Sequence, residues 1–171
     1  IPNTFTAEAM SKMSWDSITI DMQHGQNDYS TSLGMLQALS DSDVVPFVRV
    51  SWNEPGIIMK MLDLGVLGII SPMINSKKEC EDFVSYCNYP PEGQRSFGPM
   101  RAQLIHGSDY YEKANKNIIS LAMIETIVDD LEGFNIDKLP VLVPQLLNYV
   151  SKYKKMAPAT KKNLIIKMIN H

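Results

Sequence analysis

Short apolar runs rich in β-branched residues alternate along the chain with longer stretches whose apolar residues recur every three or four positions. The first pattern is typical of buried strands and the second of helices with one apolar face. Regular alternation of the two indicates repeated β-α units around a parallel sheet. The pattern is regular through the first three quarters of the 171 residues and predicts an α/β fold.

The expected elements follow one another in a simple order, beginning with a short helix. The expected strands are Ser17–Asp21, Val44–Val50, Leu67–Ser71 and Ile118–Ile124. The expected helices are Thr6–Lys12, Ser30–Leu39, Asn53–Leu64, Ser76–Cys87 and Asp109–Asn117. Ser76 and Glu79 have the spacing of a capping box, so the start of that helix is the best marked in the chain.

Two segments break this rhythm. The stretch from Tyr89 to Gly107 is rich in proline and glycine, so we expect a long loop there rather than another β-α unit. After Glu125 the pattern weakens. We expect a turn or helix start at Asn135–Leu139, helices over Pro144–Met156 and Ala159–Ile169, and no further strand.

Residues that can carry chemistry stand where the predicted strands end. Asp21 closes the first strand and His24 follows three residues later. Arg49 lies at the end of the second strand, Pro72 follows the third, and Glu125 follows the fourth. In a parallel barrel all of these positions converge on one rim. The alternative for the first strand is a helix-capping aspartate followed by a turn histidine.

The residue types at this rim suit acid-base and anion chemistry. His24 can act as a general base, with Asp21 fixing its tautomer; the alternative is a surface histidine without a task. Arg49 needs a carboxylate partner at that depth, which is either a substrate or Glu125. Glu125 suits a hard divalent cation, although an isolated glutamate after a strand is more often structural.

A second arginine lies in the Pro90–Gly98 loop. Arg95 stands there among glycines, an environment suited to phosphate or carboxylate recognition. The alternative is a rigid turn whose arginine makes a structural ion pair.

Composition excludes several classes of function. The net charge is −3, and the basic residues are spread out apart from a cluster between Lys152 and Lys167, so we expect no nucleic-acid partner. The apolar runs are too brief to cross a bilayer, and we expect no membrane partner. No P-loop, dinucleotide-binding fingerprint, zinc-ligand spacing or serine-hydrolase motif occurs in the sequence.

Length and cysteine content bear on organisation and compartment. The length suits one domain over residues 1–171. Cys80 and Cys87 would lie about 10 Å apart on one helix, too far for a disulfide, which favours the reducing cytoplasm. The chain opens at Ile1 with neither an initiator methionine nor signal-peptide regions, so we expect a processed, trimmed or incompletely recorded N-terminus.

Several motifs occur together in a fixed order from about residue 5 to residue 126. They are Phe5–Met10 with Trp15-Asp16, Ile20–Gly25, Pro46–Val50 with Asn53, Leu62–Gly65, Gly68–Ile70, Pro72-Met73, Tyr89–Arg95 with Gly98 and Arg101, Ala114-Asn115, and Ile124–Thr126. In this order the chain resembles the HpcH/HpaI aldolase family, the metal-dependent class II pyruvate aldolases that include 4-hydroxy-2-oxoheptanedioate aldolase. Residues 127–171 match the family poorly.

The resemblance implies a TIM (β/α)8 barrel that cleaves a 4-hydroxy-2-oxo acid to pyruvate and an aldehyde. It implies that Asp21 and His24 form an acid-base pair, with His24 removing the proton of the 4-hydroxyl directly or through water. It further implies that Arg49 binds the oxo-acid and stabilises the enolate, that Pro72 contacts substrate, and that Glu125 holds Mg²⁺, Mn²⁺ or Co²⁺. A cation and a guanidinium aimed at the enolate oxygen supply the stabilisation that this cleavage needs.

Three departures separate this chain from the family pattern. The family's second carboxylate metal ligand has no match in Thr126–His171. Met123 stands where the family usually has a glutamine, and a thioether cannot donate the hydrogen bonds of an amide. A full barrel takes about 250 residues, and the pattern here lacks the first strand and most of the last three β-α units.

The short barrel has two explanations. One is that the sequence omits stretches of a longer chain, for instance near Leu139–Val141, with Pro140–Met156 being a later helix. Alternatively, the chain is a truncated paralogue that has lost metal binding. Hydrophobic edges of a parallel sheet need covering, which favours the first explanation. An intact mass near 19.3 kDa would rule it out.

Two other functions remain open. One is a CoA-thioester lyase of the citrate lyase β or malyl-CoA lyase type, against which the Asp21–Gly25 signature argues. The other is a catalytically inactive subunit that binds no cation at Glu125. For the aldolase itself, the resemblance implies a small 2-oxo acid as substrate and a homo-oligomer, either a trimer or a hexamer.

Overall fold

A computed structural model describes residues 1–125, which lie within one unit of the chain, Ile1–Val128. The turn and the two helices predicted after residue 134 lie outside the described residues, and the single domain over residues 1–171 stays a prediction. The strands are β1 (Ser17–Asp21), β2 (Val45–Arg49), β3 (Gly68–Ser71) and β4 (Ile119–Ala122). The helices are α1 (Thr4–Ser11), α2 (Tyr29–Leu39), α3 (Pro55–Asp63), α4 (Lys77–Cys87), α5 (Met100–His106) and α6 (Tyr110–Asn117).

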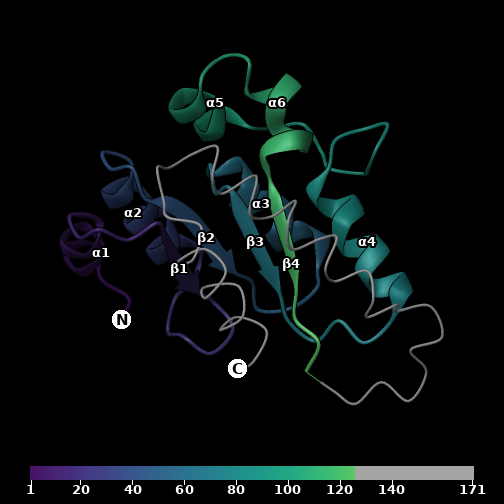
Figure 1. Cartoon of the computed structure of the whole chain (residues 1–171), viewed down its shortest axis with the longest axis horizontal. Coiled ribbons are helices and arrows are strands. Elements are labelled where there is room, and N and C mark those ends of the chain that lie inside the picture. Colours follow the sequence, from purple (N-terminus) through teal and green to yellow (C-terminus); the bar gives the residue numbers. More distant parts are fainter. Residues whose placement is uncertain (126–171) are drawn as a thin grey trace, which may run out of the picture. The chain divides into compact units, whose positions relative to one another are not determined.

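The four strands of the described part form one parallel sheet in the order β1-β2-β3-β4. Each strand pairs with the next one along the chain, and helices fill the connections (Figure 1). The strands therefore all end at the same edge of the sheet, and α5 and α6 lie at the edge from which they start (Figure 1). The predicted α/β fold with a parallel sheet is confirmed.

Polar side chains fix where the helices begin. The Asp28 carboxylate accepts the N–H of Thr31 at the start of α2, at 2.7 Å. The hydroxyl of Ser76 accepts the N–H of Glu79 at 3.2 Å, which confirms the predicted start of α4. The glutamate side chain does not bond back to Ser76 as in a regular capping box, because its Oε2 accepts the N–H of Asn75 at 2.7 Å.

The segment from Tyr89 to Gly107 is not a continuous loop, contrary to the prediction. Helix α5 occupies Met100–His106 within it. Pro99 stands just before this helix, and Gly107, with a φ of 99°, ends it. The prolines and glycines that suggested a loop therefore bracket a short helix that contains neither residue type.

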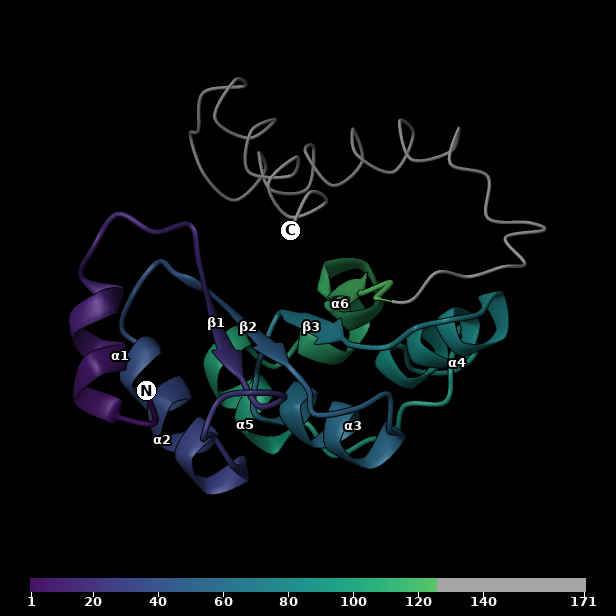
Figure 2. The same cartoon turned by 90° about the horizontal axis from the view of Figure 1, so that it is seen from below.

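The sheet buries one face against the helix layer. Ile20, Val48 and Ile69 are opposite one another in the register, and each is at most 1% exposed. Helices α2 and α3 lie on one side of the sheet (Figure 2). Side chains alternate between the two faces of a strand, so the next residues, Asp21 and Arg49, point to the other face. This alternation carries the polar strand ends away from the apolar core.

Candidate active site

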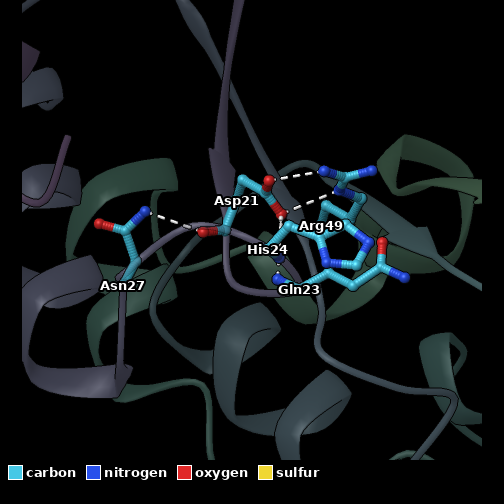
Figure 3. Close-up of polar contacts among 5 residues, drawn as sticks. All are labelled: Asp21, Gln23, His24, Asn27 and Arg49. Carbon is cyan, nitrogen blue, oxygen red and sulfur yellow. Dashed lines mark hydrogen bonds and ion pairs between the residues drawn. The ribbon is translucent and has the colours of Figure 1, made fainter.

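The ends of β1 and β2 are joined by an ion pair. Asp21 and Arg49 are the last residues of their strands and are opposite one another in the register. Arg49 donates from Nε to Asp21 Oδ1 at 2.8 Å and from Nη2 to Oδ2 at 2.5 Å (Figure 3). Two parallel bonds of this kind hold a guanidinium in a defined plane. Within the protein the ion-pair partner of Arg49 is Asp21 and not Glu125, as one of the two predicted alternatives had it, whereas binding of a substrate carboxylate by Arg49 stays a prediction.

Charge keeps both members of this pair ionised. The hydrogen bonds from Arg49 lower the pKa of Asp21 to about 2. Burial raises this pKa, and the backbone N–H groups of Gln23 and His24 lower it further. In return, the bonds to Asp21 raise the pKa of Arg49, and the negative charge of Glu125 adds to that shift. The guanidinium thus lies within the electrostatic reach of the carboxylate that follows β4.

Asp21 also organises the turn that follows β1. Its Oδ1 accepts the backbone N–H groups of Gln23 at 3.0 Å and His24 at 3.4 Å, and its carbonyl accepts Nδ2 of Asn27 at 2.8 Å (Figure 3). A side chain at Gly25 would bring its Cβ to 2.3 Å from that same carbonyl oxygen, so this turn requires glycine there. One carboxylate therefore fixes both the arginine and the turn that presents His24.

The role predicted for Asp21 toward His24 changes in this geometry. In the described part of the chain, the backbone N–H of His24, and not its ring, donates to the Asp21 carboxylate. The side chain that bonds to this carboxylate is that of Arg49. His24 is exposed at the same edge of the sheet. The alternative of a helix-capping aspartate also fails for Asp21, because Asp28 caps α2. Asp21 is an anchor for its neighbours rather than a partner of the imidazole ring.

Glu125 and Pro72 reach this edge from β4 and β3. Glu125 is exposed, and its Oε2 accepts the backbone N–H of Met73 at 2.9 Å. The ring of Pro72 is less than 2% exposed. The predicted contact of Pro72 with substrate is not supported by this placement, since a buried ring shapes the turn and offers no surface to a ligand.

One side chain at this edge, the carboxylate of Glu125, is suited to bind a divalent cation. Within residues 1–125 no group of three His, Cys, Asp or Glu side chains is placed to hold a metal ion. An exposed carboxylate does suit Mg²⁺ or Mn²⁺, since Mg²⁺ is commonly held by one or two carboxylates together with water and substrate oxygens. Glu125 therefore fits the requirement for one carboxylate ligand of such a cation.

Arg95 lies at the opposite edge of the sheet and is buried. It donates to Asp63 Oδ1 and to the hydroxyl of Tyr110, both at 3.0 Å, and its guanidinium lies 4.3 Å from the ring centre of Tyr89. Its side chain has no exposed surface. Of the two alternatives for this loop, the structure supports the structural ion pair and not anion binding.

The pairing of Asp21 with Arg49 is the feature that sequence reasoning missed. A signal for it was present, because each residue ends its strand and neighbouring parallel strands place such residues side by side. The bond from Met73 to Glu125 had no such signal.

Comparison with known proteins decides the family. The family model described as HpcH/HpaI aldolase/citrate lyase matches residues 2–129. The chain belongs to this family. The resemblance predicted from the ordered motifs is confirmed, and the match includes the strand ends described above.

The relatives of this HpcH/HpaI family member include two kinds of aldolase. The chain is 44% identical over 126 residues to a hydroxypyruvate/pyruvate aldolase from Rhizorhabdus wittichii, covering 74% of this chain and 50% of that protein. It is 36% identical over 128 residues to a 5-keto-4-deoxy-D-glucarate aldolase from Escherichia coli, with the same two shares. The chain spans about half the length of the curated relatives it matches.

Solved structures share the fold. An HpcH/HpaI aldolase/citrate lyase family protein from Burkholderia cenocepacia J2315 matches with a TM-score of 0.69 and 26% identity, over 75% of this chain and 53% of that one. The citrate synthase SbnG matches with a TM-score of 0.64 and 31% identity, over 73% and 48%. The described strands therefore correspond to part of the structures in this family.

Proposed function

We propose that this chain contributes the base and the enolate-binding arginine of a class II pyruvate aldolase, which cleaves a 4-hydroxy-2-oxo acid to pyruvate and an aldehyde. The observation that carries the proposal is the guanidinium of Arg49, held rigidly by Asp21 at the sheet edge where His24 is exposed. Relatives named as aldolases, up to 44% identical over the same residues, support it.

The reaction requires a base and a group that stabilises an enolate. His24 accepts the proton of the substrate's 4-hydroxyl, directly or through one water, while the C3–C4 bond breaks. The bonding electrons pass to C3 and give the enolate of pyruvate, with its charge on the C2 oxygen. Arg49 faces that charge as a fixed cation, which is the geometry that lowers the barrier.

Asp21 acts in this scheme as a positioning residue. Its carboxylate takes Nε and Nη2 of Arg49, and Nη1 is then the nitrogen that binds the oxo-acid. A bound Mg²⁺, Mn²⁺ or Co²⁺ supplies polarisation of the 2-oxo group, and Glu125 is the described residue that would hold it. Among residues 1–125 Glu125 is one ligand, and the cation would need further ligands beside it.

The described sheet is, in this proposal, part of a TIM (β/α)8 barrel in a cytoplasmic homo-oligomer, a trimer or a hexamer. Within residues 1–125 no helix is long and apolar enough to cross a membrane. The part of the sheet within residues 1–125 has four strands, and a closed barrel requires further strands beside them.

A coupled assay tests this function. Purified protein is incubated with a 4-hydroxy-2-oxo acid and each of the three cations, and pyruvate is measured with lactate dehydrogenase. We expect pyruvate release that requires the cation, stops on adding EDTA, and is lost in Glu125→Gln. No release with any of the three cations refutes the proposal, and absence of cation binding by calorimetry then indicates an inactive subunit.

A further inference from the structure

The ladder between β3 and β4 gains one residue where the strands end. The register runs to Ser71 opposite Ala122, and Met123 continues it by donating to the carbonyl of Ser71 at 2.9 Å. In a regular parallel ladder the next bond runs from the N–H of Met73 to the carbonyl of Met123. Here the donor to that carbonyl is Ile74, at 3.0 Å. Met73 is thus the additional residue of a β-bulge.

The backbone of Met73 is strained. Its φ is 55°, in the left-handed region. Within the part of the chain that the structure describes, Met73 is the one non-glycine residue with a positive φ. A side chain with a Cβ adopts this conformation at an energetic cost, and such residues gather at functional sites. The bulge and the positive φ are two aspects of one local distortion at the sheet edge that carries Arg49.

The distortion redirects one hydrogen-bond donor. The N–H of Met73, which a regular ladder would use on Met123, donates to Oε2 of Glu125 at 2.9 Å. Glu125 is exposed, and a free glutamate side chain samples many rotamers. A backbone donor on one oxygen restricts those rotamers and leaves the other oxygen available. Among residues 1–125, the N–H of Met73 is the group that donates a hydrogen bond to the Glu125 carboxylate.

We propose that Met73 is a positioning residue for Glu125. The bulge turns its backbone N–H onto one carboxylate oxygen, so that the other oxygen is held ready for a divalent cation. The cation part of this inference rests on the proposed function, whereas the placement of the carboxylate does not. The contribution of Met73 is made by its backbone, and its thioether is not required.

The placement is tested without any metal. Amide hydrogen exchange of the full chain is measured by NMR for the wild type and Glu125→Ala, with the cation removed. We expect the Met73 amide to exchange at least about tenfold faster in the variant, since it loses a bond to a charged acceptor. The Ile74 amide, which donates to Met123, serves as the internal control and should not change. An unchanged Met73 rate overturns the proposal.

The consequence for the cation is tested by calorimetric titration with Mn²⁺. Met73→Val, whose β-branched side chain disfavours positive φ, should weaken Mn²⁺ binding about tenfold. Met73→Ala removes the thioether but keeps an ordinary backbone preference, and Met73→Asn tolerates the left-handed region. Both should bind Mn²⁺ within about twofold of the wild type.

The outcomes separate this inference from the proposed function. Equal losses of affinity in Met73→Ala and Met73→Val overturn the backbone role, because the thioether is then what matters. If wild-type protein binds no Mn²⁺, the proposed function fails, and the exchange rates alone decide whether Met73 places Glu125. If Met73→Val does not fold, the Met73→Asn and Met73→Ala titrations and the exchange experiment still decide it.

Discussion

Two arginine–aspartate pairs lie at opposite edges of the same sheet and differ in what surrounds them. The side chains of Arg49 and Asp21 are 24% and 30% exposed at the edge where the strands end. Arg95 has no exposed side-chain surface, and its partner Asp63 is 28% exposed, near the edge where the strands begin. Both pairs have a bond of 3.0 Å or less. The bond between the charges is therefore not what distinguishes them.

The pairs differ in what contacts the part of each guanidinium that the aspartate does not bind. Arg95 also donates to the hydroxyl of Tyr110 and lies against the ring of Tyr89, so its surroundings are entirely protein. Arg49 gives two nitrogens to Asp21 and keeps exposed surface toward the strand ends. One pair therefore stabilises the fold, and the other is suited to hold a charge ready for a ligand.

Stability shows the largest expected difference between the pairs. Arg95→Met should lower the free energy of unfolding by about 2–3 kcal/mol, since it removes the hydrogen bonds that a fully buried guanidinium makes to Asp63 and Tyr110. The matched variant Arg49→Met should cost less than about 1 kcal/mol, because its pair is accessible to solvent. Urea unfolding followed by circular dichroism measures both. Equal costs would show that the two edges do not differ as described.

The Arg49 pair should matter more for activity than for stability. Arg49→Lys should lower kcat/KM for pyruvate release by about 100-fold, because an ammonium group cannot bond to Asp21 with two nitrogens and also face the enolate. The fold should be retained, which thermal unfolding of the same sample checks. A loss of only a few fold would remove Arg49 from the proposed mechanism.

Asp21→Asn separates a positioning role from a role in proton transfer. We expect kcat/KM to fall by about tenfold, since the anchor of Arg49 is weakened. The pH dependence of the rate between roughly pH 5 and 8 should stay the same, because the pKa of Asp21 is about 2 and the carboxylate does not titrate there. A shift of that profile would mean that Asp21 tunes His24 after all.

The smallest expected effect is on stability in acid. The pKa of Asp21 is lowered from 3.8 to about 2, so the unfolded chain binds the proton more readily. The contribution of this group to stability is complete above pH 3.8 and is lost as the pH falls toward 2. Urea midpoints across this range should fall less steeply in Asp21→Asn than in the wild type. Identical slopes would contradict the ion pair in solution.

The strands and most helices could be predicted because local patterns determine them. The run ending at Asp21 is rich in β-branched residues, and Ser76 marks a helix start by its hydroxyl. Helix α5 was missed because the prolines and glycines around Met100–His106 outweighed seven residues that contain neither. A short helix that is stabilised by tertiary packing leaves little local signal.

The site was predictable in its residues but not in its pairings. Asp21, His24, Arg49 and Glu125 all stand at strand ends, and the fold brings those ends to one edge. Which carboxylate takes the guanidinium depends on register and rotamers, which the sequence does not display. The bulge at Met73 was hidden for a related reason, since positive φ is normally marked by glycine or asparagine.

Exchange of the C3 hydrogens of pyruvate with deuterium oxide is the most direct test that the sheet edge forms a pyruvate enolate site. It requires only a base, Arg49 and the cation, and no aldehyde. Mass spectrometry of pyruvate incubated with the protein should show deuterium uptake with Mg²⁺ or Mn²⁺, and none with EDTA or in Glu125→Gln. Uptake that persists in EDTA or in that variant, or no uptake with either cation, would contradict the account.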